Sequence, residues 1–101
     1  MKNLVLVVPT SIYPAVIDEL RALDVPGFSV CHVEGHGSHT AQDGVLSAQD
    51  RVVGFVPRVR IDMVLDGEAI ESLLTTLTRA GSVLSGQGYW WVAPVERAGR
   101  F

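Results

Sequence analysis

The sequence of 101 residues lacks several features that would assign a protein to a class. It has one cysteine, Cys31, which excludes an internal disulfide and fits a reducing cytoplasm. Its formal net charge is -3, so it lacks the basic field of a protein whose main partner is nucleic acid. Its first apolar run, Leu4 to Val8, is too short for a signal peptide or a membrane span. These absences predict a soluble, cytoplasmic protein that does not bind nucleic acid.

The patterns that indicate catalysis are also missing. No Ser-His-Asp or Cys-His arrangement can be placed, and no pair of carboxylates has a helical or strand spacing that suits acid-base chemistry. The run Gly35-His36-Gly37 is no dinucleotide-binding fingerprint, because the helix that such a motif requires does not follow it. The sequence therefore predicts a binding protein and not an enzyme.

What the chain does have is apolar content, since 48% of its residues are hydrophobic. This is enough for one folded domain over residues 1–101. A domain of this size buries only about two-thirds of its unfolded surface, so a sizeable ligand cleft must open at an edge or between subunits. We therefore expect oligomerisation, with ligands bound where copies of the chain meet.

Hydrophobic periodicity predicts alternating strands and helices. A continuous Leu/Val run is typical of a strand buried on both faces, while apolar residues at i, i+3, i+4 and i+7 indicate a helix. Ser11 and Asp66 are expected to cap the two helices, and Gly81 is expected to follow the second. The expected strands are residues 3–8, 28–36, 51–65 and 89–95, and the expected helices follow Ser11 and Asp66. The order βαββαβ predicts an α+β, ferredoxin-like fold, with two helices on one face of an antiparallel sheet.

The most distinctive segment is the long loop between the second and third strands, at residues 37–54. The strand before it ends in Gly35-His36-Gly37, and the strand after it carries Arg58 and Arg60 on one face. The glycines allow a ligand to approach the backbone closely, and the two arginines can attract an anion to the same place. Together they indicate a loop hinged over an anion site. An alternative is a solvent-facing stripe of arginines on an edge strand, with Asp62 as their partner.

Several motifs in register resemble the PII signal-transduction family. They are Gly27-Phe28-Ser29-Val30, Val33-Glu34-Gly35-His36-Gly37, Phe55-Val56-Pro57-Arg58-Val59-Arg60-Ile61-Asp62, Gly86-Gln87-Gly88 and the terminal segment from Arg97 to Arg100. The resemblance spans essentially the whole chain. It implies a homotrimer that binds an adenine nucleotide in the clefts between its subunits, with residues 37–54 as the T-loop.

The same resemblance assigns roles to individual residues. It implies that Ser29 contacts the adenine, that Arg58 faces the phosphates, and that Arg97 and Arg100 close over the nucleotide. The Gly86-Gln87-Gly88 turn would direct backbone amides at the phosphates, as anion-binding nests do. The expected nucleotide- and anion-binding residues are Ser29, Gly35, His36, Gly37, Arg58, Arg60, Asp62, Gly86, Gln87, Gly88, Arg97 and Arg100.

Departures from the PII pattern alter the expected ligand and signal. Tyr89 replaces the lysine that follows the Gly-x-Gly turn, which favours AMP or ADP over ATP. His39 and Arg51 replace the T-loop glutamine and the modifiable tyrosine, which argues against nitrogen signalling. The resemblance then implies a non-nitrogen-sensing branch whose loop regulates a membrane transporter from the inner face of the membrane. A small anion such as bicarbonate is a candidate second ligand.

A different class of function rests on the histidines. His32, Glu34 and His36 alternate along one strand and His39 follows, so imidazoles and a carboxylate could meet on one metal ion. This alternative is a metal-tolerance protein resembling CutA, linked to heavy-metal efflux. The simpler interpretation is a solvated strand edge, with Cys31 as a small core residue. A third alternative is an interaction module whose loop binds a partner without any small ligand.

The aromatic run Tyr89-Trp90-Trp91 stands out at the start of the last strand. Because adjacent side chains on a strand point to opposite faces, at least one ring must point away from the face that the helices cover. We expect such a ring to lie in an oligomer interface.

Overall fold

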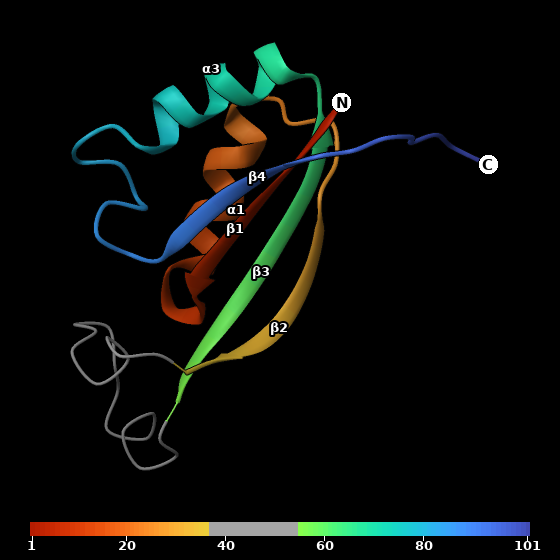
Figure 1. The fold of residues 1–101 in the computed structure, drawn as a ribbon. Helices are drawn as coiled ribbons and strands as arrows, with labels where there is room; N and C mark the ends of the chain where they lie inside the picture. Colours follow the sequence, from red (N-terminus) through yellow and green to blue (C-terminus); the bar gives the residue numbers. More distant parts are fainter. Residues whose placement is uncertain (37–54) are drawn as a thin grey trace.

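The computed structural model describes residues 1–36 and 55–101. Figure 1 shows the elements in chain order. They are β1 (Lys2–Pro9), a 3₁₀ turn (Thr10–Ile12), α1 (Tyr13–Ala22), β2 (Ser29–Gly35), β3 (Val56–Leu65), α3 (Gly67–Leu77) and β4 (Tyr89–Pro94). The predicted ferredoxin-like order of strands and helices is thus confirmed.

The strands form one antiparallel sheet in the order β2-β3-β1-β4. β1 and β3 lie at its centre, so β3 is not the edge strand that the alternative reading of Arg58 and Arg60 required. Leu4 to Val8 of β1 are all buried, which confirms a strand buried on both faces. The two strands that pair with β1 bring larger side chains beside its valines, since Val5 pairs with Asp62 and Trp91, and Val7 pairs with Arg60 and Tyr89.

Both helices pack on the same face of the sheet. The core joins alternate residues of β1 and β3, such as Leu6 and Ile61, to the apolar stripe of each helix. In α3 this stripe is Ile70, Leu73, Leu74 and Leu77, the spacing that the sequence predicted, and all four side chains are buried. The opposite face carries no helix among the described residues (Figure 1), and we call it the open face.

The ends of the helices differ from prediction. α1 begins at Tyr13 and not after Ser11, because Pro14 fits the first helical turn and residues 10–12 form a 3₁₀ turn. α3 begins after Asp66 as predicted but ends at Leu77, well before Gly81. There the Ser82 hydroxyl donates a 2.7 Å hydrogen bond to the Leu77 carbonyl, which ends the helix by giving a terminal carbonyl a partner outside it.

Cys31 is exposed, so its interpretation as a core residue was wrong. It pairs with Arg60 in the register of β2 and β3, which places it on the open face. A further finding concerns the membrane: no helix in the described part of the chain is both long and apolar enough to cross one.

Candidate functional site

The open face carries a hydrogen-bonded cluster on its central strands. Arg60 donates to the Asp62 carboxylate through Nε at 2.8 Å and through a terminal nitrogen at 3.0 Å. The Asn3 amide donates to the same carboxylate at 3.2 Å. The hydrogen bond from Arg60 is the main reason that the pKa of Asp62 is held below its ordinary value. The same contact raises the pKa of Arg60, so both groups stay charged and paired.

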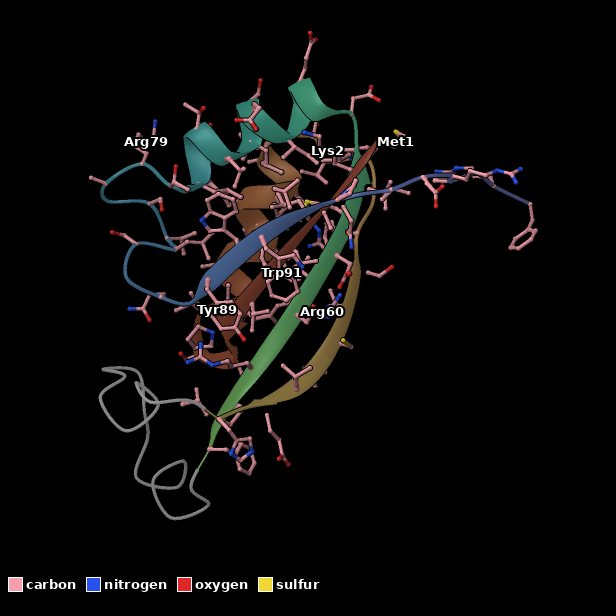
Figure 2. The ribbon with its side chains drawn as sticks, viewed as in Figure 1. Met1, Lys2, Arg60, Arg79, Tyr89 and Trp91 are labelled. Atoms are coloured by element: carbon pink, nitrogen blue, oxygen red, sulfur yellow. The ribbon has the colours of Figure 1, made fainter. Side chains whose placement is uncertain are left out.

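Two aromatic rings of β4 lie beside these charges on the open face. Tyr89 and Trp91 stack, with their centroids 6.0 Å apart and their planes 19° from parallel. The Arg58 guanidinium lies 6.0 Å from the centre of the Tyr89 ring, and that of Arg60 lies 5.3 Å from the Trp91 ring. Figure 2 shows Arg60 and Trp91 on neighbouring parts of this face. Each arginine thus lies within cation–π distance of an aromatic ring.

Trp90 points the other way, because it pairs with Leu6 of the helix-covered face. The prediction that at least one of the three rings leaves the helix-covered face is therefore confirmed, and two of them do. Tyr89 and Trp91 remain 55% and 38% exposed in the single chain. Their contact with a second copy of the chain stays a prediction.

Several of the expected site residues gather at one end of the sheet, where β2 ends and β3 begins, among them Gly35, Arg58 and Gly88. A methyl group on Gly35 would clash with the side chain of Arg58, so the glycine makes room for the arginine. On β4's side, Gly88 has a φ of +115°, and a methyl group there would clash with the Val7 carbonyl. Gly88 is therefore required by the close approach of a backbone, whereas an alanine at Gly35 would only displace the flexible side chain of Arg58. We call this the loop end, because residues 37–54 connect there.

The Gly86-Gln87-Gly88 turn delivers the chain into β4 at this loop end. The backbone N–H of Gln87 donates to the Leu84 carbonyl at 2.9 Å, which closes the turn. The side-chain Oε1 of Gln87 is buried and has no hydrogen-bond partner among the described residues. A buried acceptor normally has a partner, but this atom is too deeply buried for a ligand to reach it in this conformation.

Other expected site residues lie far from the loop end within one chain. Ser29 starts β2 at its opposite end, where it pairs with Asp62. Arg97 and Arg100 follow β4 and are exposed, on a terminal segment that leads away from the sheet in Figure 1. Gly37 lies outside the described residues. A single chain therefore brings Gly35, Arg58 and Gly88 to one end and leaves Ser29, Arg97 and Arg100 at the other.

The histidines do not form a metal site within the described residues. His36 Nε2 lies 3.1 Å from Glu34 Oε2, and the His36 ring contacts Phe55 with centroids 5.6 Å apart. The His32 ring instead meets Tyr13 edge-on at 6.4 Å. Residues 1–36 and 55–101 contain no group of three or more side chains able to hold a metal ion. His39 lies outside these ranges, so the metal-tolerance alternative stays a prediction.

Sequence reasoning missed two members of the open-face cluster, Asn3 and Trp91. Both belong to strands that are distant in sequence from Asp62 and Arg60, and only the register of the sheet brings them together. The available signal was the alternation along β1, which sets Asn3 on the same face as Val5 and Val7. It became informative only once β1 was known to pair with β3 and β4.

Comparison with known proteins shows the family of the chain. Residues 1–101 match the model of a family described as "Protein of unknown function (DUF3240)". The chain is 32% identical over 92 residues to a protein named "Nitrogen regulatory protein P-II" from Cereibacter sphaeroides, covering 86% of this chain and 82% of that protein. Proteins of the same name from Rhodobacter capsulatus and Azospirillum brasilense are 29% and 27% identical, over 86% and 88% of this chain and 82% and 84% of theirs. The chain therefore belongs to the DUF3240 family, and it is a divergent PII-like protein.

Proposed function

We propose that this PII-like regulatory protein is a homotrimer that binds an adenine nucleotide, AMP or ADP in preference to ATP, between its subunits. The observation that carries the proposal is the position of Arg58 at the loop end. Its side chain lies over Gly35 and beside the Tyr89 ring, at the root of residues 37–54. An arginine oriented by a ring and a backbone suits a phosphate, which it can bind with two parallel hydrogen bonds.

The separation of the expected site residues supports a site that spans two subunits. Ser29, Arg97 and Arg100 lie at the end of the sheet away from Arg58 and Gly88. One nucleotide can meet both sets only if one copy supplies the loop end and a neighbouring copy supplies the other end. This arrangement also suits a small domain, which has little volume to spare for an internal cleft.

The preference for AMP or ADP follows from Tyr89. This residue stands where the PII pattern has a lysine, and its ring stacks on Trp91. It brings no ammonium group to a terminal phosphate, so the third phosphate of ATP gains little from this position. In the same proposal, a small anion such as bicarbonate is the second ligand near the arginines. Residues 37–54, with the nucleotide bound at their root, then bind a membrane transporter.

Calorimetric titration with AMP, ADP and ATP tests nucleotide binding. We expect AMP and ADP to bind the wild-type chain and Arg58→Ala to weaken them by about ten- to a hundredfold, as loss of a charged hydrogen bond does. Arg21→Ala is the matched control, since Arg21 is an exposed arginine in the last turn of α1. No heat with any adenine nucleotide would refute the proposal.

Two further measurements separate the parts of the proposal. Sedimentation equilibrium should give three chains per particle, and a monomer that still binds nucleotide would contradict the intersubunit site. Hydrogen exchange compares residues 37–54 with and without AMP. If exchange in this segment does not change, the nucleotide does not act through the loop, even where binding itself is found.

A further inference from the structure

The side chains of the open face lie in rows that cross the strands. In one row, Arg60 of β3 and Tyr89 of β4 lie on either side of the central strand β1. In the next row, Asp62 and Trp91 lie on either side of it. β1 contributes a valine to each of these rows, and its short side chain lets a longer one reach across the strand. The arginines of β3 can therefore contact the rings of β4.

The Asp62 carboxylate turns Arg60 toward the neighbouring row. Arg60 donates hydrogen bonds to this carboxylate at 2.8 and 3.0 Å, and its guanidinium lies 5.3 Å from the centre of the Trp91 ring. Two parallel charge-assisted hydrogen bonds fix the direction of a guanidinium. The Asn3 amide donates to the same carboxylate and so helps to hold Asp62 in place. Arg60 is thereby directed to Trp91 and not to Tyr89, the ring of its own row.

Trp91 also stacks on the next ring of the same strand. The centroids of Tyr89 and Trp91 are 6.0 Å apart, and their planes are 19° from parallel. Arg58 lies two residues before Arg60 on β3, and its guanidinium is 6.0 Å from the centre of the Tyr89 ring. Figure 2 shows Tyr89, Trp91 and Arg60 together on this face. We call Arg60, Trp91, Tyr89 and Arg58 the open-face stack.

The two ends of the open-face stack have different partners. At one end, Arg60 is hydrogen-bonded to Asp62. At the other end, Arg58 lies over Gly35 at the loop end. A cation–π contact at an exposed site is weak and depends on the position of the ring. The direction of Arg58 therefore depends on where Tyr89 is held.

We propose that Trp91 is a positioning residue for the nucleotide phosphate, because its stacking on Tyr89 keeps that ring where it orients Arg58. The inference rests on the proposed function, in which Arg58 binds the phosphate of AMP or ADP. Trp91 acts through Tyr89 and does not itself contact the nucleotide. The stack thus explains why an aromatic residue follows Tyr89 on the open face of β4.

Calorimetric titration of the full chain with AMP tests this role. Trp91→Leu should weaken AMP binding about three- to tenfold, which is the effect of losing one aromatic stack. Trp91→Phe keeps a ring on the strand and should restore most of the affinity. Trp90→Leu is the matched control and should bind AMP as the wild type does. Trp90 is the adjacent tryptophan and is also partly exposed, at 48% against 38% for Trp91, but it points to the helix-covered face.

A double-mutant cycle separates positioning from a structural role. If Trp91 acts through Arg58, Trp91→Leu should have no further effect on AMP binding in the Arg58→Ala chain. An equal loss in both backgrounds would overturn the proposal, because Trp91 would then act independently of Arg58. Sedimentation equilibrium must also give the wild-type particle for Trp91→Leu. A smaller particle would show that Trp91 acts on assembly, which overturns the proposal as well.

NMR of the chain without nucleotide tests the orientation of Arg58 directly. Trp91→Leu should shift the Arg58 Nε–H signal, and Trp90→Leu should leave it in place. In the wild type we expect nuclear Overhauser contacts from Trp91 to Tyr89 and from Tyr89 to Arg58. Their absence would overturn the proposal, and they decide the matter if Trp91→Leu does not fold.

The outcomes distinguish this inference from the proposed function. If the wild type binds AMP and Trp91→Leu binds it equally well, only the role of Trp91 is refuted. If the wild type binds no adenine nucleotide, the proposed function and the role of Trp91 are both refuted.

Discussion

The two faces of the sheet are built from different chemistry. The face beneath α1 and α3 is aliphatic, and its core residues, such as Leu6 and Ile61, are almost wholly buried. The open face pairs Arg60 with Asp62 and lays two arginines against aromatic rings. Val5 and Val7 are nevertheless buried there, although no helix covers them in the described chain. The helix-covered face therefore holds the fold together, while the open face carries groups suited to binding.

The largest expected effect compares the two faces of β3 directly. Ile61→Ala removes a fully buried side chain from the helix-covered face and should lower the free energy of unfolding by about 2–5 kcal/mol. Val64→Ala is the matched control, since Val64 lies on the open face of the same strand and is 42% exposed. It should change stability by about 0.5 kcal/mol or less. Urea denaturation measures both free energies of unfolding. Equal losses would contradict the conclusion that the helix-covered face holds the fold together.

A smaller effect is expected from the two glycines of the loop end. Gly88→Ala forces a side chain into a left-handed backbone and against the Val7 carbonyl, which should cost about 1–3 kcal/mol. Gly35→Ala meets only the flexible side chain of Arg58 on the open face, and should cost about 0.5 kcal/mol while displacing that arginine from Tyr89. Gly27→Ala, with open space around it, is the control. Thermal unfolding ranks the three variants by stability. A cost for Gly35→Ala as large as that for Gly88→Ala would show that the Arg58 side chain cannot move aside.

The smallest effect concerns acid and the Arg60–Asp62 pair. Because the pKa of Asp62 is lowered in the folded chain, its stabilisation is present above the unfolded pKa and is lost as the pH falls through the folded value. Asp62→Asn should therefore reduce stability at neutral pH and have less effect below about pH 3. The difference should stay below about 1 kcal/mol, since both side chains are partly open to solvent.

Urea denaturation at the two pH values measures this difference. Asp18→Asn, an exposed change of the same charge on α1, corrects for net charge. An Asp62→Asn variant with the same loss of stability at both pH values would show that the ion pair does not contribute through its charge.

Much of the fold was predictable because the relevant patterns are local. The Leu/Val run of β1 and the spacing of Ile70, Leu73, Leu74 and Leu77 led to the right elements and the right buried faces. The boundaries were less predictable, since α3 ends about a turn early where the Ser82 hydroxyl meets the Leu77 carbonyl. That contact depends on how the following segment turns, which periodicity does not report.

The candidate site was predictable only in part. The sequence indicated that Gly35 and Arg58 flank one loop and that Asp62 is a partner for arginine. In the structure Gly35 lies against Arg58, and Asp62 accepts a hydrogen bond from Arg60. It did not indicate that Tyr89 and Trp91 would stack beside Arg58 and Arg60, or that Cys31 would be exposed. These contacts join strands that are far apart in sequence, and their register has no local signature.

The sequence by itself determined where strands and helices form and which of their residues are apolar, because these follow from side-chain spacing and turn chemistry over a few residues. Only the tertiary structure decided that β3 lies at the centre of the sheet, and that Arg58, Gly35 and Gly88 share one end while Arg97 and Arg100 leave from the other. The physical reason is that strand order and register are set by burying one face against both helices at once. This requirement acts across the whole chain, so strand order and register cannot be inferred from any short segment.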